Sequence, residues 1–170
     1  MDLKLKGKRA LITGATRGMG RAIAETLAGE GCNLSICARK EKEVAATVES
    51  LQAKGITAYG AAVDVTRDAE VKDWVAKSAE QLGGLDMIVS NVGAMDLGTG
   101  RDSWEKNFNL DVMGLVNLVD STVDPDSAVI AALLFAAGRG SLPACQALRI
   151  TPSAVPYPPV ASPSELPCPR

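Results

Sequence analysis

The chain contains no histidine among its 170 residues. Histidine is the side chain that most often serves as a general base near neutral pH, and it is the commonest metal ligand in proteins. The four cysteines, Cys32, Cys37, Cys145 and Cys168, form no Cys-x-x-Cys pair and show no zinc-type spacing. We therefore expect no metal site, and any acid–base chemistry must come from other residue types.

Long hydrophobic runs and a strong charge imbalance are also missing. The longest apolar run, residues 128–137, is about half the roughly 20 residues that a membrane span needs. The N-terminal stretch MDLKLKGKRALITG has neither the apolar core nor the cleavage site of a signal peptide. The net charge of −2 favours neither nucleic acid nor an anionic membrane as a partner. We expect a cytoplasmic protein that binds neither of them.

Proline and lysine are unevenly distributed along the chain. All nine prolines lie beyond Val123, and the last lysine is Lys106. Residues 151–170 are rich in Pro, Ser and Ala. Because proline has no backbone N–H to donate in a sheet or helix and the stretch has few large apolar side chains to bury, we predict a disordered tail. We divide the chain into an ordered region, 1–120, a segment at 121–150 with a predicted fifth strand and irregular structure, and the tail at 151–170.

The first 120 residues alternate strand and helix patterns. Short β-type runs occupy 9–13, 33–38, 57–65 and 85–90. Apolar residues at helical spacing predict helices at about 19–30, 41–54 and 71–82, and a further helix with Ser103 as its N-cap. Apolar strands separated by amphipathic helices indicate a parallel sheet covered on both faces. We predict an α/β fold, a Rossmann-type doubly wound parallel sheet, incomplete at its C-terminal side.

A glycine-rich turn joins the first strand to the first helix, with the sequence Thr13-Gly14-Ala15-Thr16-Arg17-Gly18-Met19-Gly20. Its glycines allow a tight turn, the close approach of a diphosphate and close contact between helix and strand. The amides of the first helical turn then face the anion, and the helix dipole favours its charge. Because the turn follows a strand and opens a helix within a βαβ unit, it predicts a dinucleotide site; the alternative is a turn without a ligand.

The spacing TGxxxGxG of this turn resembles the fingerprint of the short-chain dehydrogenase/reductase family. Three further motifs follow in the order that this resemblance implies: Asp64-Val65 after the third strand, Ser90-Asn91-Val92-Gly93 after the fourth, and Asn109 in the next helix. In the family, the Asp holds the adenine ring, the pattern after the fourth strand is NNAG, and the helical Asn helps to organise the catalytic relay. Without the family context, these residues would be a strand cap, a turn residue and an ordinary helix residue.

The end of the second strand determines which nicotinamide cofactor is preferred. An Asp or Glu there would accept a hydrogen bond from the hydroxyl of an unphosphorylated ribose and would repel a phosphate. This chain has no acid there, and its sequence is Cys37-Ala38-Arg39-Lys40. Arg39 can bind a 2′-phosphate with two hydrogen bonds, and Arg17 can approach it from the other side. The pair resembles the NADP-preferring type of the family, so we expect NADP (NADPH) rather than NAD. The alternative is that one or both arginines are solvated surface charges.

The resemblance implies a catalytic Tyr with a Lys four residues later and a Ser on the fifth strand. Because no lysine follows Lys106, that Tyr-Lys pair is absent, and Tyr157 is followed four residues later by Ala161. If the fifth strand lies at 128–138, Leu134 or Phe135 occupies the position of the Ser. We therefore expect an oxidoreductase-type chain, of the kind that oxidises alcohols or reduces carbonyls, with negligible turnover of its own.

Two accounts fit this loss. A reading-frame shift near residues 120–126 would explain the abrupt change to Pro, Ala, Ser and Arg, whose codons are largely GC-rich, and the composition favours it. The other account is a natural truncation that leaves a non-catalytic NADP-binding or interaction protein. In intact relatives the resemblance implies a small-molecule alcohol or carbonyl substrate and a homo-oligomer, and neither carries over to this chain without its C-terminal elements.

The predicted site contains one residue of the catalytic set, Asn109, and no metal ligand. The predicted cofactor-binding residues are Gly14, Thr16, Arg17, Gly18, Met19, Gly20, Arg39, Asp64, Val65, Asn91 and Gly93.

Overall fold

The apolar runs of the sequence form the strands of one sheet, whose order is β3-β2-β1-β4-β5-β6. The computed structural model describes residues 4–94, 96–122, 130–133 and 147–149. Neighbouring strands are parallel except for β5 and β6, which are antiparallel. The strands are β1 (Arg9–Thr13), β2 (Asn33–Ala38), β3 (Ala58–Ala62), β4 (Met87–Ser90), β5 (Ile130–Leu133) and β6 (Ala147–Arg149).

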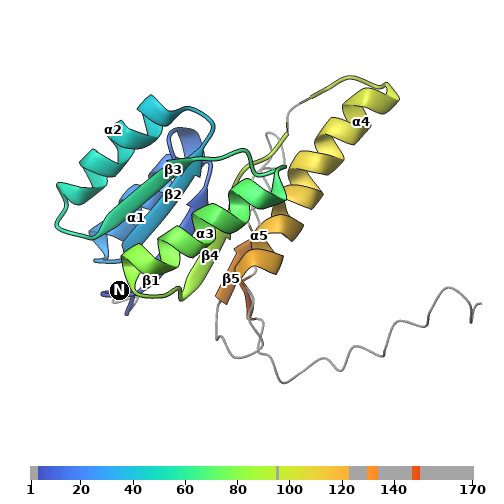
Figure 1. Ribbon diagram of the computed structural model, residues 1–170. Coiled ribbons are helices and arrows are strands. Elements are labelled where there is room, and N and C mark those ends of the chain that lie inside the picture. Colours follow the sequence, from blue (N-terminus) through green and yellow to red (C-terminus); the bar gives the residue numbers. More distant parts are fainter. Residues whose placement is uncertain (1–3, 95, 123–129, 134–146, 150–170) are drawn as a thin grey trace, which may run out of the picture.

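Helices join the parallel strands and cover both faces of the sheet (Figure 1). Most of them carry an apolar stripe at helical spacing, such as Val71, Trp74 and Val75, which are buried in α3. The helices are α1 (Gly18–Gly29), α2 (Glu41–Gln52), α3 (Asp68–Leu82), α4 (Arg101–Phe108), the π-helical turn η1 (Asn109–Met113) and α5 (Gly114–Thr122).

Each face of the sheet has its own hydrophobic core. Alternate side chains of a strand point to opposite faces, so in β1 Ala10 and Ile12 enter one core and Leu11 enters the other. The first core packs against α1 and α2, and the second packs against α3 and α5, which run along the same side of the sheet in Figure 1. The predicted α/β Rossmann-type sheet is therefore confirmed.

The strand order reverses direction at β1, and this position determines where a ligand can bind. From β1 the chain builds outward through β2 and β3, then returns to place β4 on the other side of β1. In open parallel sheets, the loops diverge at such a point and leave a crevice at the carboxyl ends of the strands. The glycine-rich turn after β1 and the loop after β4 both lie at this edge.

The structure differs from the sequence-based expectations mainly beyond β4. The helix predicted to begin after Ser103 begins at Arg101 with Gly100 as its N-cap, whose carbonyl oxygen accepts from the amides of Ser103 and Trp104, and the Ser103 hydroxyl donates to Asp96 at 3.0 Å. Strand β6 was not predicted. Strand β5, Ile130–Leu133, is parallel to β4 and lies within the stretch 128–137 where a fifth strand was predicted. The rest of 128–137 and the tail at 151–170 lie outside the described residues.

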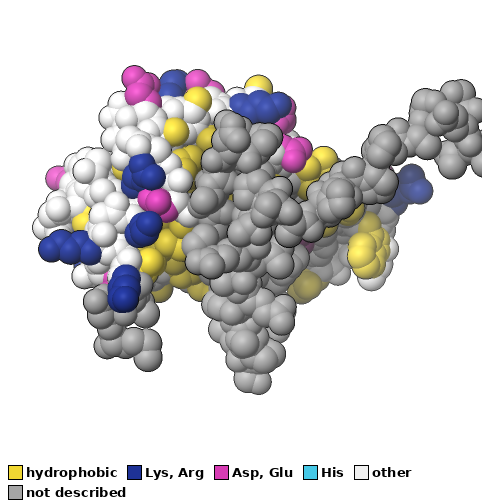
Figure 2. All heavy atoms as spheres, turned by 90° about the horizontal axis from the view of Figure 1, so that it is seen from below, with side chains coloured by type: hydrophobic (Ala, Val, Ile, Leu, Met, Phe, Trp, Pro, Cys, Tyr) yellow, Lys and Arg dark blue, Asp and Glu magenta, His cyan; other side chains and the backbone are white. Residues whose placement is uncertain are grey.

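Helix α4 extends away from the sheet, at the upper right of Figure 1. Its aromatic side chains are exposed, with 71% of Trp104 and 55% of Phe108 accessible to solvent. Figure 2 shows hydrophobic side chains both at this end and over the middle of the molecule, with acidic and basic side chains interspersed among them. Within the described ranges, no helix combines the length and the apolar character needed to cross a membrane.

Candidate functional site: a cleft at the carboxyl edge of the sheet

A cleft of about 380 Å³ lies at the carboxyl edge of β1, β2 and β4. This volume lies within the range of small-molecule and cofactor pockets. The residues that line it come from the turn after β1, the end of β2, the start of α2, the segment after β3, the loop after β4, and η1. They are Gly14, Thr16, Arg17, Gly18, Met19, Cys37, Ala38, Arg39, Lys40, Glu43, Val63, Asp64, Val65, Asn91, Val92, Gly93, Ala94 and Leu110.

The glycine-rich turn is fixed against its neighbours by backbone contacts. The Gly14 amide donates to the Cys37 carbonyl oxygen at 2.8 Å, which ties the turn to the end of β2. Gly14 has φ +66°, a backbone conformation that residues with a Cβ atom rarely adopt. A Cβ atom at position 20 would collide with the Gly14 carbonyl oxygen and the Asn91 amide. Glycine at 20 therefore allows helix α1 to begin directly against the turn.

The first turn of α1 is open to an anion. Its N-cap, Arg17, makes no side-chain capping hydrogen bond, and the first turn contains no acidic residue. The amides of that turn lack the side-chain partner that a Ser, Thr or Asp cap would supply. Together with the dipole of α1, they fit a phosphate group placed in the cleft.

Asn91 links the loop after β4 to the glycine-rich turn. Its side-chain amide donates to the carbonyl oxygens of Thr13 at 3.1 Å and Gly14 at 3.2 Å. The Thr13 hydroxyl accepts from the backbone amides of Asn91 at 3.0 Å and Val92 at 3.3 Å. These contacts join segments far apart in sequence and form the floor of the cleft.

One end of the cleft is rich in positive charge. The side chains of Arg17 and Arg39 are exposed to solvent, and neither makes an ion pair with the described part of the chain. Lys40 Nζ, by contrast, lies 2.7 Å from Glu43 Oε1. The second oxygen of Glu43 accepts from the Thr16 hydroxyl at 3.3 Å. Two guanidinium groups are therefore available to an anion at this end.

Asp64 lies after β3, where its carboxylate forms a local turn. The Thr66 hydroxyl and amide donate to Asp64 Oδ1 at 2.8 and 3.0 Å. Burial raises the pKa of Asp64, but the Thr66 hydrogen bonds and the charges of Arg67 and Arg39 outweigh it and hold that pKa below its usual value. Oδ2 has no hydrogen-bond partner among the residues described, so it can accept from a ligand in the cleft.

The π-helical turn η1 closes the cleft on the β4 side. Leu110 lines the cleft, and Asp111 Oδ1 accepts from the Ala94 amide at 2.6 Å, which holds the loop after β4 in place. Asn109 does not lie with these residues. It is exposed and borders a separate hollow with Arg101, Trp104, Glu105 and Phe108.

The structure brings most of the sequence-predicted residues together. Ten of them line the cleft: Gly14, Thr16, Arg17, Gly18, Met19, Arg39, Asp64, Val65, Asn91 and Gly93. Gly20 does not line the cleft but packs against Gly14 and Asn91, which do. Asn109 borders the separate hollow at α4.

Sequence reasoning missed Glu43 and Asp111. For Glu43 a signal was available, because it lies three residues after Lys40, a spacing that places two side chains on the same face of a helix. In the described ranges, no group of His, Cys, Asp or Glu side chains is arranged to hold a metal ion.

Comparison with known proteins agrees with this geometry. The sequence model of the short chain dehydrogenases matches residues 8–128. Isoepoxydon dehydrogenase of Penicillium expansum is 42% identical over 118 residues, which cover 68% of this chain and 46% of the fungal protein. The 3-oxoacyl-[acyl-carrier-protein] reductase FabG of Staphylococcus epidermidis is 32% identical over 117 residues, or 66% of this chain and 48% of the bacterial protein.

Solved structures show the same fold. A short chain dehydrogenase from Burkholderia cenocepacia in complex with NADP superposes with a TM-score of 0.66 and 32% identity, over 69% of this chain and 50% of that one. L-Sorbose reductase from Gluconobacter frateurii, complexed with NADPH and L-sorbose, superposes with a TM-score of 0.66 and 32% identity, over 72% of this chain and 48% of that one. The chain thus spans about half the length of the relatives it matches.

Proposed function

The chain belongs to the short-chain dehydrogenase family, and on that premise we propose that its cleft binds a nicotinamide dinucleotide, with NADP(H) preferred over NAD(H). The observation that carries this proposal is the position of Arg17 and Arg39, which line one end of the cleft without an ion-pair partner in the described structure. A 2′-phosphate carries the charge and the acceptor oxygens that two free guanidinium groups bind. The NADP and NADPH named for two similar structures are consistent with it.

The remaining cleft residues suit the other parts of the dinucleotide. The glycine-rich turn and the first amides of α1 would hold the diphosphate. Asp64, through Oδ2, and the backbone of Val65 would contact the adenine. Asn91 and Gly93 would border the ribose and the path toward the nicotinamide. When bound, the cofactor supplies or accepts a hydride, and the chain's own residues bind and orient it.

For the whole protein we propose the family reaction, oxidation of a small-molecule alcohol or reduction of a carbonyl. Proton transfer to the developing alkoxide requires an acid of suitable pKa. These 170 residues have no lysine after Lys106 to lower the pKa of a tyrosine there. Asn109 stays a prediction, and we assign it no step because its side chain does not border the cleft. We therefore propose that this chain binds cofactor but turns over little or no substrate.

The alternative is a non-catalytic NADP-binding or interaction protein. A formed cleft combined with the missing Tyr-Lys pair favours it as a second candidate. The exposed Trp104 and Phe108 of α4 supply an apolar surface against which another chain can pack. For intact relatives we propose that the assembly is a homo-oligomer. A cytoplasmic location stays part of the proposal.

Two measurements on the purified chain test these proposals. Calorimetric titration with NADPH and NADH measures the two dissociation constants, and we expect the tighter one for NADPH. NADPH consumption in the presence of a panel of ketones and aldehydes measures turnover, and we expect none above the rate without protein. Binding with sustained turnover would contradict the proposed inactivity, and failure to bind either cofactor would contradict the proposed function itself.

Sequencing the coding DNA from the codon for Leu110 onward separates the two accounts of the C-terminal segment. Translation of the other frames should reveal a Tyr with a Lys four residues later if a frame shift has occurred. An intact frame with no such alternative would support the non-catalytic protein.

A further inference from the structure

We propose that Glu43 weakens the binding of a 2′-phosphate and so determines how strongly the cleft prefers NADP(H) over NAD(H). This inference rests on the proposed function and adds a residue to it. The sequence places no acid at the end of β2, which by itself predicts an unopposed positive site. The structure instead brings a carboxylate to the same place from the first turn of α2.

The contacts of Glu43 join the two walls of the cleft at its positive end. Its Oε2 accepts from the hydroxyl of Thr16, which belongs to the turn after β1, at 3.3 Å. Its Oε1 accepts from Lys40 Nζ at 2.7 Å. Glu43 therefore lies between the two backbone segments that carry Arg17 and Arg39, the residues proposed to bind the phosphate.

The charges at this end have competing effects. Glu43 pairs with the exposed Lys40, so a phosphate would have to compete with this carboxylate for that ammonium group. The hydrogen bond from Lys40 lowers the pKa of Glu43, and the nearby Thr16 and Arg17 lower it further, so the carboxylate is ionised at neutral pH. A phosphate with close to two negative charges would be repelled by that carboxylate.

The unphosphorylated cofactor meets the opposite situation. A ribose 2′-hydroxyl carries no charge and can donate a hydrogen bond to a carboxylate. Glu43 therefore repels the phosphate of NADP(H) and can accept a hydrogen bond from the ribose of NAD(H). Both effects reduce the preference that Arg17 and Arg39 create.

The substitution Glu43→Gln tests this inference, because it keeps the shape and removes the charge. Calorimetric titrations use NADPH, NADH and two nucleotide fragments, 2′,5′-ADP and 5′-ADP, so no turnover is needed. We expect the dissociation constants for NADPH and 2′,5′-ADP to fall about twofold to tenfold. Those for NADH and 5′-ADP should stay the same or rise.

The control variant is Glu49→Gln, which removes an exposed carboxylate from the same helix at a position that does not line the cleft. It should leave all four constants unchanged. If Glu43→Gln leaves the ratio of the NADPH and NADH constants unchanged, or shifts it toward NADH, the role of Glu43 is wrong while cofactor binding stands. If wild type and variant bind none of the four probes, the proposed function fails and the inference fails with it.

Discussion

The side-chain amide of Asn91 donates to the carbonyl oxygen of Gly14 at 3.2 Å, across 77 positions of sequence. The same amide lies where a Cβ at position 20 would need to be. The loop after β4, the turn after β1 and the start of α1 therefore meet at one point. The shape of the proposed diphosphate site depends on that point, because all three segments border or support the cleft.

Replacing Asn91 with alanine should reduce both stability and cofactor affinity. The carbonyl oxygens of Thr13 and Gly14 would lose a donor, at a cost of about 1–3 kcal/mol in the free energy of unfolding. Urea unfolding measures that loss, and titration with NADPH should show weaker binding. The control Gln52→Ala removes the hydrogen bond that the Gln52 side-chain amide donates to the Ala58 carbonyl oxygen, outside the cleft. It should reduce stability without weakening NADPH binding. Equal effects of both variants on affinity would contradict the special role of Asn91.

Replacing Gly20 with alanine should destabilise the chain by about 1–3 kcal/mol, because the added methyl group has no room between α1 and the glycine-rich turn. Gly29, at the other end of α1, has open space around its Cβ position. Gly29→Ala should therefore be neutral or stabilise by up to about 1 kcal/mol. Thermal or urea unfolding of both variants provides the comparison. A Gly20→Ala protein as stable as Gly29→Ala would show that the close contact is absent.

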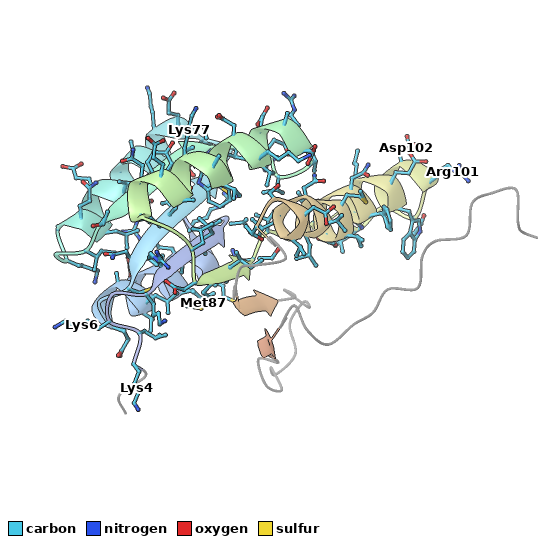
Figure 3. The ribbon with its side chains drawn as sticks, turned by 60° about the horizontal axis from the view of Figure 1, so that its bottom comes forward. Lys4, Lys6, Lys77, Met87, Arg101 and Asp102 are labelled. Carbon is cyan, nitrogen blue, oxygen red and sulfur yellow. The ribbon has the colours of Figure 1, made fainter. Side chains whose placement is uncertain are left out.

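Replacing Arg39 with alanine should weaken NADPH binding by about tenfold to a hundredfold, the usual effect of losing charged hydrogen bonds. NADH has no 2′-phosphate, so its affinity should change little. The control is Arg101→Ala, since Arg101 lies at the far end of α4, away from the cleft (Figure 3). If Arg39→Ala weakens the binding of NADH as much as the binding of NADPH, Arg39 does not contact the 2′-phosphate.

The ion pair between Arg9 and Asp86 should make stability depend on pH. The hydrogen bond from Arg9 Nε at 2.7 Å is the main cause that lowers the pKa of Asp86, and the Arg9 amide adds to it. A carboxylate whose pKa is lower in the folded state stabilises the fold above its unfolded pKa of about 3.9. That contribution is lost as the pH falls through the lowered value.

The variant Asp86→Asn should therefore be about 1–2 kcal/mol less stable than wild type at neutral pH, and the difference should shrink in acid. Urea unfolding over a pH series measures it. Asp73→Asn removes an exposed partner of Lys77 on α3 and should change the stability far less than Asp86→Asn does. A difference for Asp86→Asn that is the same at pH 7 and in acid would contradict the lowered pKa.

The first half of the fold could be predicted closely from the sequence. Strand β2 runs from Asn33 to Ala38 as predicted, because its buried residues are apolar except Ser35, whose hydroxyl is hydrogen-bonded to Trp74 and Ser78. Strand β3 is shorter than the predicted 57–65, since pairing with β2 ends at Ala62. The residues beyond it, including Val63 and Asp64, turn into the cleft.

The region after β4 could not be predicted in the same way. The π-helical turn at Asn109–Met113 contains an extra residue per turn, which shifts the face of every helical position that follows it, and no residue type in this stretch signals such a turn. Within this turn, the Asp111 carboxylate accepts from the Ala94 amide and so reaches the loop after β4. The spacing of Glu43 from Lys40 indicates that the two side chains share a helix face, but which face of α2 borders the cleft depends on tertiary packing.

Whether this cleft binds the dinucleotide can be measured by hydrogen exchange of the backbone amides with and without NADPH. We expect slower exchange at residues 14–20, 38–40 and 91–93, which come from three separate segments around one cleft. Helix α4, which borders a different hollow, should exchange at an unchanged rate. Protection confined to α4, or no protection in the three cleft segments at saturating NADPH, would contradict the assignment of this cleft as the dinucleotide site.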